Sequence, residues 1–216
     1  MERHPAFEEY CECIFELHED DLDVIQARIA ERLEVSRASV SQMIDKLTKA
    51  GLVESVDNRV QLTADGTDLA TTVVRRHRLA ERFLTDVLGL SWAEAHHEAG
   101  KWEHVMSDSV EAAMNRLLGA PTTCPHGNPI PGSSYVDPDT RPLGTLSAGT
   151  EFTVSRIPEE LEFTPGLLEF LESSSIQPGR RGCVSSVDRD GSMELDVDGR
   201  RISVDAFASA RILVTA

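Results

Sequence analysis

Two short segments of this sequence place histidine and carboxylate side chains together on predicted helical faces. In RRHRLAERF, His77 and Glu81 are four residues apart, so they share one face of a helix. In HHEAGKWEH, His96 and Glu103 are seven residues apart on one face, and His104 adjoins them. Imidazole with carboxylate is a donor set for divalent first-row metal ions. A single such segment could be an ordinary solvated surface, but two segments separated by one turn favour a metal site.

Further candidate donors lie elsewhere in the chain. Glu9 and Glu12 are three residues apart on the first predicted helix and form a third acidic pair. Cys124 and His126 flank a proline; this thiol and imidazole could bind metal, although a structural loop is the interpretation that we favour. We expect His97, next to His96, to be solvated.

These side chains need helices to hold them, and the spacing of apolar residues predicts where the helices lie. Between the third and fourth helices, LVESVDNRVQLT predicts a two-stranded wing that turns at Asp57-Asn58. Helix, helix, turn, helix and wing together form a winged helix-turn-helix. The predicted helices cover residues 6–19, 22–34, 37–50, 64–88, 91–106 and 109–118.

The third helix, over about 37–50, would enter the major groove of DNA. Hydroxyl and amide side chains can bind phosphates and base edges there. The alternative is a three-helix module that binds a protein. The residues that we expect to contact DNA are Ser36, Arg37, Ser39, Ser41, Gln42 and Lys46, with Arg59 of the wing on a phosphate.

The pattern changes after residue 120. Residues 121–148 are rich in Pro, Gly, Ser and Thr and read as a linker. From residue 149, alternating apolar residues and Asp-Gly turns predict a small β-barrel. The predicted division is therefore 1–72 for DNA binding, 73–120 for metal binding and dimerisation, 121–148 for the linker and 149–216 for the barrel.

The charge of the 216-residue chain is unusual, because 37 acidic residues against 21 Lys and Arg give a net charge of -16. DNA binding normally needs a positive surface, so one interpretation is an acidic protein that never meets nucleic acid. The interpretation that we favour is a protein from an organism with very high intracellular salt, such as a halophilic archaeon. At molar salt the Debye length is only about 3 Å, so local contacts outweigh the global charge.

The sequence predicts a cytoplasmic protein with reduced thiols. No apolar run approaches the roughly 20 residues of a membrane helix, and the acidic N-terminus lacks the layout of a signal peptide. The spacing of the four cysteines fits neither a disulfide framework nor an all-cysteine zinc site. Cys11 and Cys13 are expected to pack in the core, although Cys13 could become a ligand if the first helix turns.

Several segments resemble the diphtheria-toxin-repressor family of iron- and manganese-dependent repressors. The resemblance spans nearly the whole chain and is carried by RRHRLAERFLTDVLGL, HHEAGKWEHVMSD, SVSQMIDKL and CPHGNPIPG. It implies an α+β multidomain fold with a winged helix-turn-helix, a helical dimerisation domain and a C-terminal SH3-like β-barrel. Trp102, Val105 and Met106 are candidates for the core of a homodimer interface.

The resemblance also implies two metal sites per subunit for Mn(II) or Fe(II). The first maps onto His77, Glu81 and His96, and the segment IPEELEFTPGLLEFLESSSIQPG adds Glu159 and Glu162 from the C-terminal domain. Five ligands from two domains would make this site a clamp between them.

The second implied site, the one usually tied to activation, is where the sequence departs from the family. Glu103 and His104 match, and Glu9 and Glu12 of the first helix stand at carboxylate positions of manganese sensors. Gly100 stands where the family has Cys or Glu, so only its carbonyl could ligate. Carboxylate in place of sulfur favours a harder ion, and hence Mn(II) over Fe(II).

The resulting hypothesis is a metal-dependent repressor of metal-homeostasis genes. Its partners would be a double-stranded DNA operator and a second copy of the chain, with no membrane and no small organic substrate. One alternative is a metal-binding adaptor whose winged module contacts a protein. A metal-dependent enzyme is less favoured, because the sequence holds no HExxH motif and no nucleophile elbow.

Overall fold

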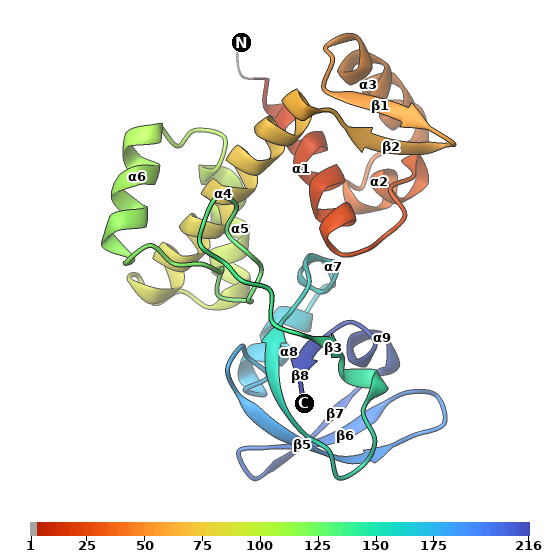
Figure 1. Cartoon of the computed structure of the whole chain (residues 1–216), viewed down its shortest axis with the longest axis vertical. Helices are drawn as coiled ribbons and strands as arrows, with labels where there is room; N and C mark the ends of the chain where they lie inside the picture. Colours follow the sequence, from red (N-terminus) through yellow and green to blue (C-terminus); the bar gives the residue numbers. More distant parts are fainter. Residues whose placement is uncertain (1–3) are drawn as a thin grey trace.

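The computed structural model describes residues 4–216, which form three parts (Figure 1). The predicted domain over 1–72 begins with three residues that lie outside this description. The elements are α1 Pro5–Glu19, α2 Gln26–Arg32, α3 Arg37–Lys49, β1 Val53–Val56, β2 Arg59–Leu62, α4 Ala64–Asp86, α5 Trp92–Trp102, α6 Asp108–Leu117, β3 Arg141–Pro142, the 3₁₀ turn η1 Leu143–Thr145, β4 Glu151–Arg156, α7 Glu159–Glu162, α8 Leu167–Ser173, β5 Arg181–Val187, β6 Met193–Val197, β7 Arg200–Val204, α9 Ala206–Ser209 and β8 Leu213–Thr215.

The first part is the predicted winged helix-turn-helix, built from α1 to α3 and the hairpin β1–β2. Ser36 caps α3 by accepting the backbone N–H of Ser39, which satisfies a donor that the helix leaves open. The chain leaves α3 through Gly51, at φ +75°. The wing turns at Asp57 and Asn58, both with positive φ, as a two-residue hairpin requires.

Two helix boundaries differ from the prediction. The second helix begins at Gln26 and not at residue 22, because Ile25 is extended and acts as its N-cap. The helix that follows Ser91 ends at Trp102 and not near residue 106, and Glu103 is its C-cap. This helix begins with a capping box, in which Ser91 and Glu94 are bonded reciprocally.

The second part is α4, α5 and α6, and α4 is the element that connects all three parts. It packs against both α1 and α5, and its Arg78 binds Glu159 of the β-domain. Its N-terminus lies so close to the wing that a Cβ on Gly66 would be 1.9 Å from the carbonyl oxygen of Leu52. Only glycine fits there, which fixes the start of α4 against the winged module.

The third part is a six-stranded antiparallel sheet in the order β3-β8-β4-β5-β6-β7. Its hairpin β6–β7 turns at Asp198-Gly199, as predicted. The predicted linker over 121–148 is not devoid of structure, because β3 pairs with β8 at Arg141 and Pro142. The backbone of His126 and that of Ile157 are also bonded, so the segment is attached to the β-domain.

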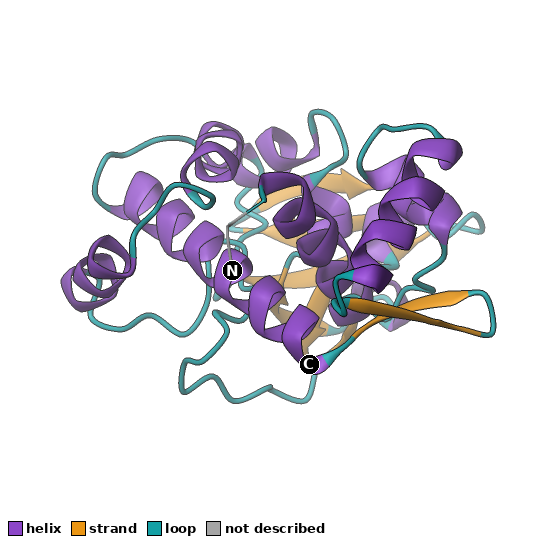
Figure 2. Ribbon diagram, turned by 90° about the horizontal axis from the view of Figure 1, so that it is seen from above, coloured by secondary structure: helices purple, strands orange, loops and turns teal. Residues whose placement is uncertain are grey.

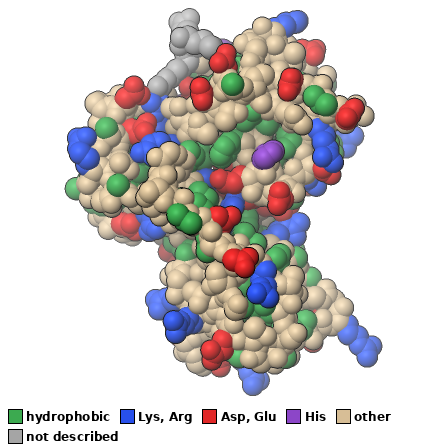
Figure 3. Space-filling view, in the orientation of Figure 1, with side chains coloured by type: hydrophobic (Ala, Val, Ile, Leu, Met, Phe, Trp, Pro, Cys, Tyr) green, Lys and Arg blue, Asp and Glu red, His purple; other side chains and the backbone are tan. Residues whose placement is uncertain are grey.

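Seen from above, the helices of the first two parts lie over the strands of the third, and the wing projects at one side (Figure 2). A narrow waist joins the β-domain to the helical parts, and acidic and basic side chains are interspersed on the face shown (Figure 3). Across residues 4–216, the helices are all too short or too polar to cross a membrane.

Candidate metal centre

The core of the candidate centre is a triangle of donor atoms on α4 and α5. His77 and Glu81 are one turn apart on α4 and are 7% and 0% exposed. His77 Nε2 is 3.2 Å from Glu81 Oε1 and 3.3 Å from His96 Nδ1, and this Nδ1 is 3.0 Å from Glu81 Oε1. Ligands at right angles around an ion at about 2.1 Å are about 3.0 Å apart. The triangle therefore has the dimensions of one face of a metal coordination shell.

The short helix α7 brings the C-terminal part to this triangle. Glu162 Oε2 is 3.1 Å from His96 Nδ1, and Glu159 and Glu162 form one donor group with His96. Glu159 also has a second partner, because its Oε1 accepts a 2.9 Å hydrogen bond from Arg78 Nη2. The structure thus brings together all five residues of the first implied site.

His126 and Cys124 also reach this cluster, where the sequence favoured a structural loop. His126 is fully buried, and its Nδ1 is 2.8 Å from Glu162 Oε2 and 3.6 Å from Glu81 Oε1. Cys124 completes a donor group with Glu81 and His126. The Cys-Pro-His spacing was the visible signal, but its distance along the chain from His77 concealed the contact. We call these seven residues, His77, Glu81, His96, Cys124, His126, Glu159 and Glu162, the first cluster.

Unused donor atoms make the first cluster suitable for a cation. Glu81 Oε2, Glu159 Oε2 and His126 Nε2 are buried and make no hydrogen bond, and Glu162 Oε2 is paired only with the imidazoles of His96 and His126. Buried polar atoms without partners are costly. A divalent ion would satisfy several of them at once, and the nitrogen and carboxylate donors suit Mn(II) or Fe(II).

The electrostatics of the first cluster show how strongly its groups interact. Burial disfavours the charged imidazole of His77, but Glu81 and Glu103 outweigh it and raise the His77 pKa well above its ordinary value. Burial likewise opposes the charge on Glu162, yet His126 lowers the pKa of that carboxyl to about 2. The imidazoles lower the pKa of the Glu81 and Glu162 carboxyls, whereas burial and the charge of Glu162 raise that of Glu159, so a bound dication would compete with protons for these donors.

The second cluster is formed by Glu12, Glu103, His77 and His104. His77 Nδ1 is 2.5 Å from Glu103 Oε2, and His104 Nε2 is 3.2 Å from Glu103 Oε1. Glu12 joins His77 and Glu103 in one donor group. Burial and the charge of Glu103 raise the pKa of Glu12 well above its ordinary value. One acceptor of this cluster is left unsatisfied, since Glu12 Oε1 is buried without a hydrogen-bond partner.

Two predicted members of the second site lie at its margin. Glu9 is exposed, and its neighbour Glu8 is the residue that contacts His104, at 2.8 Å from Nδ1. A Cβ on Gly100 would meet open space, so no side chain fills the position. Glu9 and Gly100 both line a cavity of about 390 Å³ that also reaches His77 and Glu103. The two clusters therefore border one cavity.

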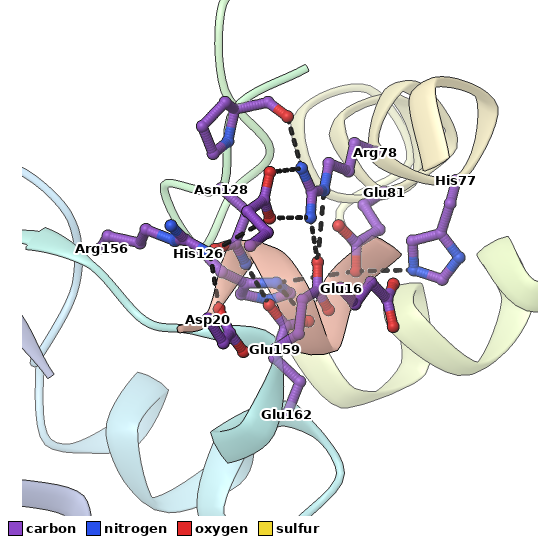
Figure 4. A network of polar contacts seen from close by, with 12 residues as sticks. Glu16, Asp20, His77, Arg78, Glu81, His126, Asn128, Arg156, Glu159 and Glu162 are labelled. Carbon is purple, nitrogen blue, oxygen red and sulfur yellow. Dashed lines mark hydrogen bonds and ion pairs between the residues drawn. The ribbon is translucent and has the colours of Figure 1, made fainter. Parts of the chain in front are cut away.

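Two arginines, Arg78 and Arg156, lie beside the first cluster and connect its carboxylates to α1 (Figure 4). Arg78 is fully buried and donates to Glu19, Glu159 and the carbonyl of Pro129. Arg156 donates to Asp20 at 2.6 Å, to Glu19 at 3.1 Å and to Asn128. Asn128 in turn donates to Glu162 Oε1 at 2.7 Å. The residues that we call the arginine network are Arg78, Arg156, Glu19, Asp20, Asn128 and Glu159.

The residues predicted to contact DNA lie at α3 and β2 of the winged module and belong to neither cluster. All of them are exposed: Ser36, Arg37, Ser39, Ser41, Gln42, Lys46 and Arg59. Arg59 pairs with Asp23 at 2.7 Å, so its guanidinium rests beside the loop before α2. The opposite face of α3 is buried, with Val40, Ile44 and Leu47 in the core.

A winged helix-turn-helix joined to a buried cluster of histidines and carboxylates defines a class of metal-controlled DNA-binding proteins. Two family models match the chain. They are the N-terminal DNA-binding domain of iron-dependent repressors, over residues 4–59, and their metal-binding and dimerisation domain, over residues 63–132.

Known proteins agree with these matches. The iron-dependent repressor of Mycobacterium leprae is 49% identical over 126 residues, 58% of this chain and 55% of that protein. The diphtheria toxin repressor of Corynebacterium diphtheriae is 38% identical over 207 residues, 91% of each chain. A manganese-dependent transcriptional repressor solved with manganese has a TM-score of 0.87 at 33% identity, covering 97% of this chain and 99% of that one. The chain belongs to the iron-dependent repressor family, which includes the diphtheria toxin repressor.

Proposed function

We propose that this protein is a transcriptional repressor that binds operator DNA as a homodimer when it holds Mn(II) or Fe(II). The observation that carries the proposal is the triangle of His77, Glu81 and His96, whose donor atoms are 3.0 to 3.3 Å apart, as ligands of one cation would be. We infer sensing and not catalysis, because the family is one of transcriptional repressors. The regulated genes would be those of metal homeostasis.

We propose that the first cluster is the main sensing site. Its ligands would come from His77, Glu81, His96 and Glu162, with Glu159, Cys124 and His126 within reach. Such a site would join α4 and α5 to α7, and so would fix the β-domain against the helical parts.

We propose a second site per subunit at Glu12, Glu103 and His104, with Glu8, Glu9 or the carbonyl of Gly100 completing it. Carboxylate donors dominate this set, which favours Mn(II) over Fe(II). Because Glu12 lies on α1 and Glu103 at the end of α5, ligation by both would link the DNA-binding part to the dimerisation part. A bound cation supplies charge neutralisation that lets these acidic side chains approach one another.

Dimerisation would set the distance between two winged modules. Val110 and Leu117 are seven residues apart on one face of α6 and are 45% and 67% exposed, and Val105 is 80% exposed. We propose this apolar surface as part of the homodimer interface. Met106, which the sequence suggested for the interface, is buried in the core of its own chain. Two modules in a dimer would reach half-sites about 34 Å apart.

The test is retention of DNA from a pool of random duplexes, with MnCl₂ or with EDTA. Retention is expected to be about tenfold or more greater with MnCl₂, and the retained sequences should have two-fold symmetry. The double variant Ser39→Ala, Gln42→Ala should lose specific retention and keep its affinity for Mn(II). Equal retention in EDTA would refute metal control. Unchanged retention by the double variant would instead favour the adaptor whose winged module contacts a protein.

A further inference from the structure

The imidazole of His77 lies between the two clusters and faces both. Its Nε2 is 3.2 Å from Glu81 Oε1 and 3.3 Å from His96 Nδ1, within the first cluster. Its Nδ1, on the other side of the ring, is 2.5 Å from Glu103 Oε2, within the second. His77 is accordingly a member of a donor group on each side.

A neutral imidazole carries one N–H and one lone pair, so His77 cannot offer both nitrogens as ligands. The two ring nitrogens have different surroundings. Nε2 lies beside two other potential metal ligands, so a lone pair on this nitrogen could also bind the metal. Nδ1 meets the carboxylate of Glu103, which accepts a hydrogen bond but cannot donate one when ionised. The tautomer that satisfies both sides has its proton on Nδ1.

We propose that Glu103 is a positioning residue for the first cluster, in addition to being a donor of the second. By accepting the N–H of His77 Nδ1, it fixes the ring's tautomer and orientation and directs the Nε2 lone pair at Glu81 and His96. This rests on the proposed metal binding and specifies how the two sites are connected. A carboxylate that holds a ligating imidazole in this way raises the ligand's basicity.

The positioning role belongs to Glu103 and not to Glu12, its neighbour in the second cluster. Both residues are 5–8% exposed, and both belong to the donor group with His77. Only Glu103 makes a hydrogen bond to the His77 ring. Removing either residue damages the second cluster, but only removal of Glu103 should also weaken the first. Glu12→Gln is therefore a matched control.

The experiment is calorimetric titration of the full chain with MnCl₂, with His96→Ala identifying the binding event of the first cluster. Glu12→Gln should change the affinity of that event by less than about threefold, whereas Glu103→Ala should weaken it about 10- to 100-fold. Glu103→Gln, which keeps an accepting oxygen, should fall between the two. Equal first-cluster affinities in Glu12→Gln and Glu103→Ala would overturn the proposal.

A second measurement needs no variant at Glu103. Long-range ¹H–¹⁵N spectra of the wild-type chain loaded with Zn(II), a diamagnetic probe, should place the His77 proton on Nδ1. A proton on Nε2 would overturn the proposal. Neither measurement involves DNA, so the proposal can fail while metal-controlled DNA binding stands. A wild-type chain that binds no metal would overturn both.

Discussion

At the scale of single residues, His96 Nδ1 is the atom at which several potential metal ligands of the centre converge. It lies 3.0 to 3.3 Å from donor atoms of Glu81, Glu162 and His77. Burial opposes protonation of His96, but the carboxylates of Glu162 and Glu81, which accept hydrogen bonds from its ring, raise its pKa well above the ordinary value. The carboxylates and imidazoles are thus packed at the spacing of metal ligands.

These raised pKa values predict that metal binding releases protons. An imidazole must be neutral to ligate, and His77 and His96 hold their protons to a higher pH than free imidazole does. Mn(II) affinity should therefore fall as the pH is lowered, by about tenfold per pH unit for each displaced proton. Calorimetry in two buffers of different protonation enthalpy counts these protons. The same affinity at about pH 6 and about pH 8 would contradict the prediction.

Site residues that lie close together in the sequence could be predicted from it, whereas residues that only the fold brings together could not. His77 and Glu81 were predictable because four residues of helix bring them to one face. Glu162 came only from the family resemblance, since nothing near it in sequence marks it as a ligand. For His126 the sequence favoured a structural loop, because its contacts with Glu81 and Glu162 depend on the path of a segment that has no helical periodicity.

At the scale of elements, α1 carries acidic residues to two different places. Glu8, Glu12 and Glu16 recur every four residues and are all buried along one face of the helix. The sequence analysis selected Glu9 and Glu12 by their three-residue spacing, but Glu9 is exposed, and the buried face carries Glu8 in its place. Glu19 and Asp20, at the end of the helix, bind the arginine network. α1 is consequently held at the second cluster and at the β-domain.

The arginine network predicts that Arg156 stabilises the docking of α1 on the β-domain. Arg156→Gln would leave the buried Asp20 carboxylate without its ion pair and should lower the free energy of unfolding by about 2–3 kcal/mol. Urea unfolding of the metal-free chain measures this. Arg180→Gln is the control, because its pair with Asp198 is half exposed and contributes little. Equal stabilities of the two variants would contradict the role assigned to Arg156.

Element types were predictable from the sequence wherever the signal is local. The caps at Ser36 and Ser91 and the turns at Asp57-Asn58 and Asp198-Gly199 are set by neighbouring residues. The start of α2 and the strand β3 were not. β3 exists because Arg141 and Pro142 pair with β8, about seventy residues later, and no local pattern encodes that partner.

At the scale of the whole molecule, three parts of the chain meet at one centre. α1 comes from the winged module, α4 and α5 from the dimerisation part, and α7 from the β-domain. A cation at such a junction can act on DNA binding only through a difference in affinity between two arrangements of the parts. This explains how a buried site can influence α3, whose exposed residues lie outside both clusters.

The net charge of -16 does not prevent a local DNA-binding surface. Residues 36–50 hold Arg37, Lys46 and Lys49 against the single acid Asp45, and all four are exposed. We propose that the remaining acidity is an adaptation to a high-salt cytoplasm, where screening confines electrostatic effects to such local contacts.

The most direct test of the account is the affinity of the protein for a retained duplex, measured by fluorescence anisotropy against free Mn(II) concentration. His96→Ala is compared with His97→Ala, since His97 is exposed and adjacent but belongs to neither cluster. The account predicts that wild type and His97→Ala gain about tenfold or more in DNA affinity as Mn(II) rises, and that His96→Ala gains little. DNA affinity that is independent of Mn(II), or a His96→Ala response equal to that of wild type, would contradict it.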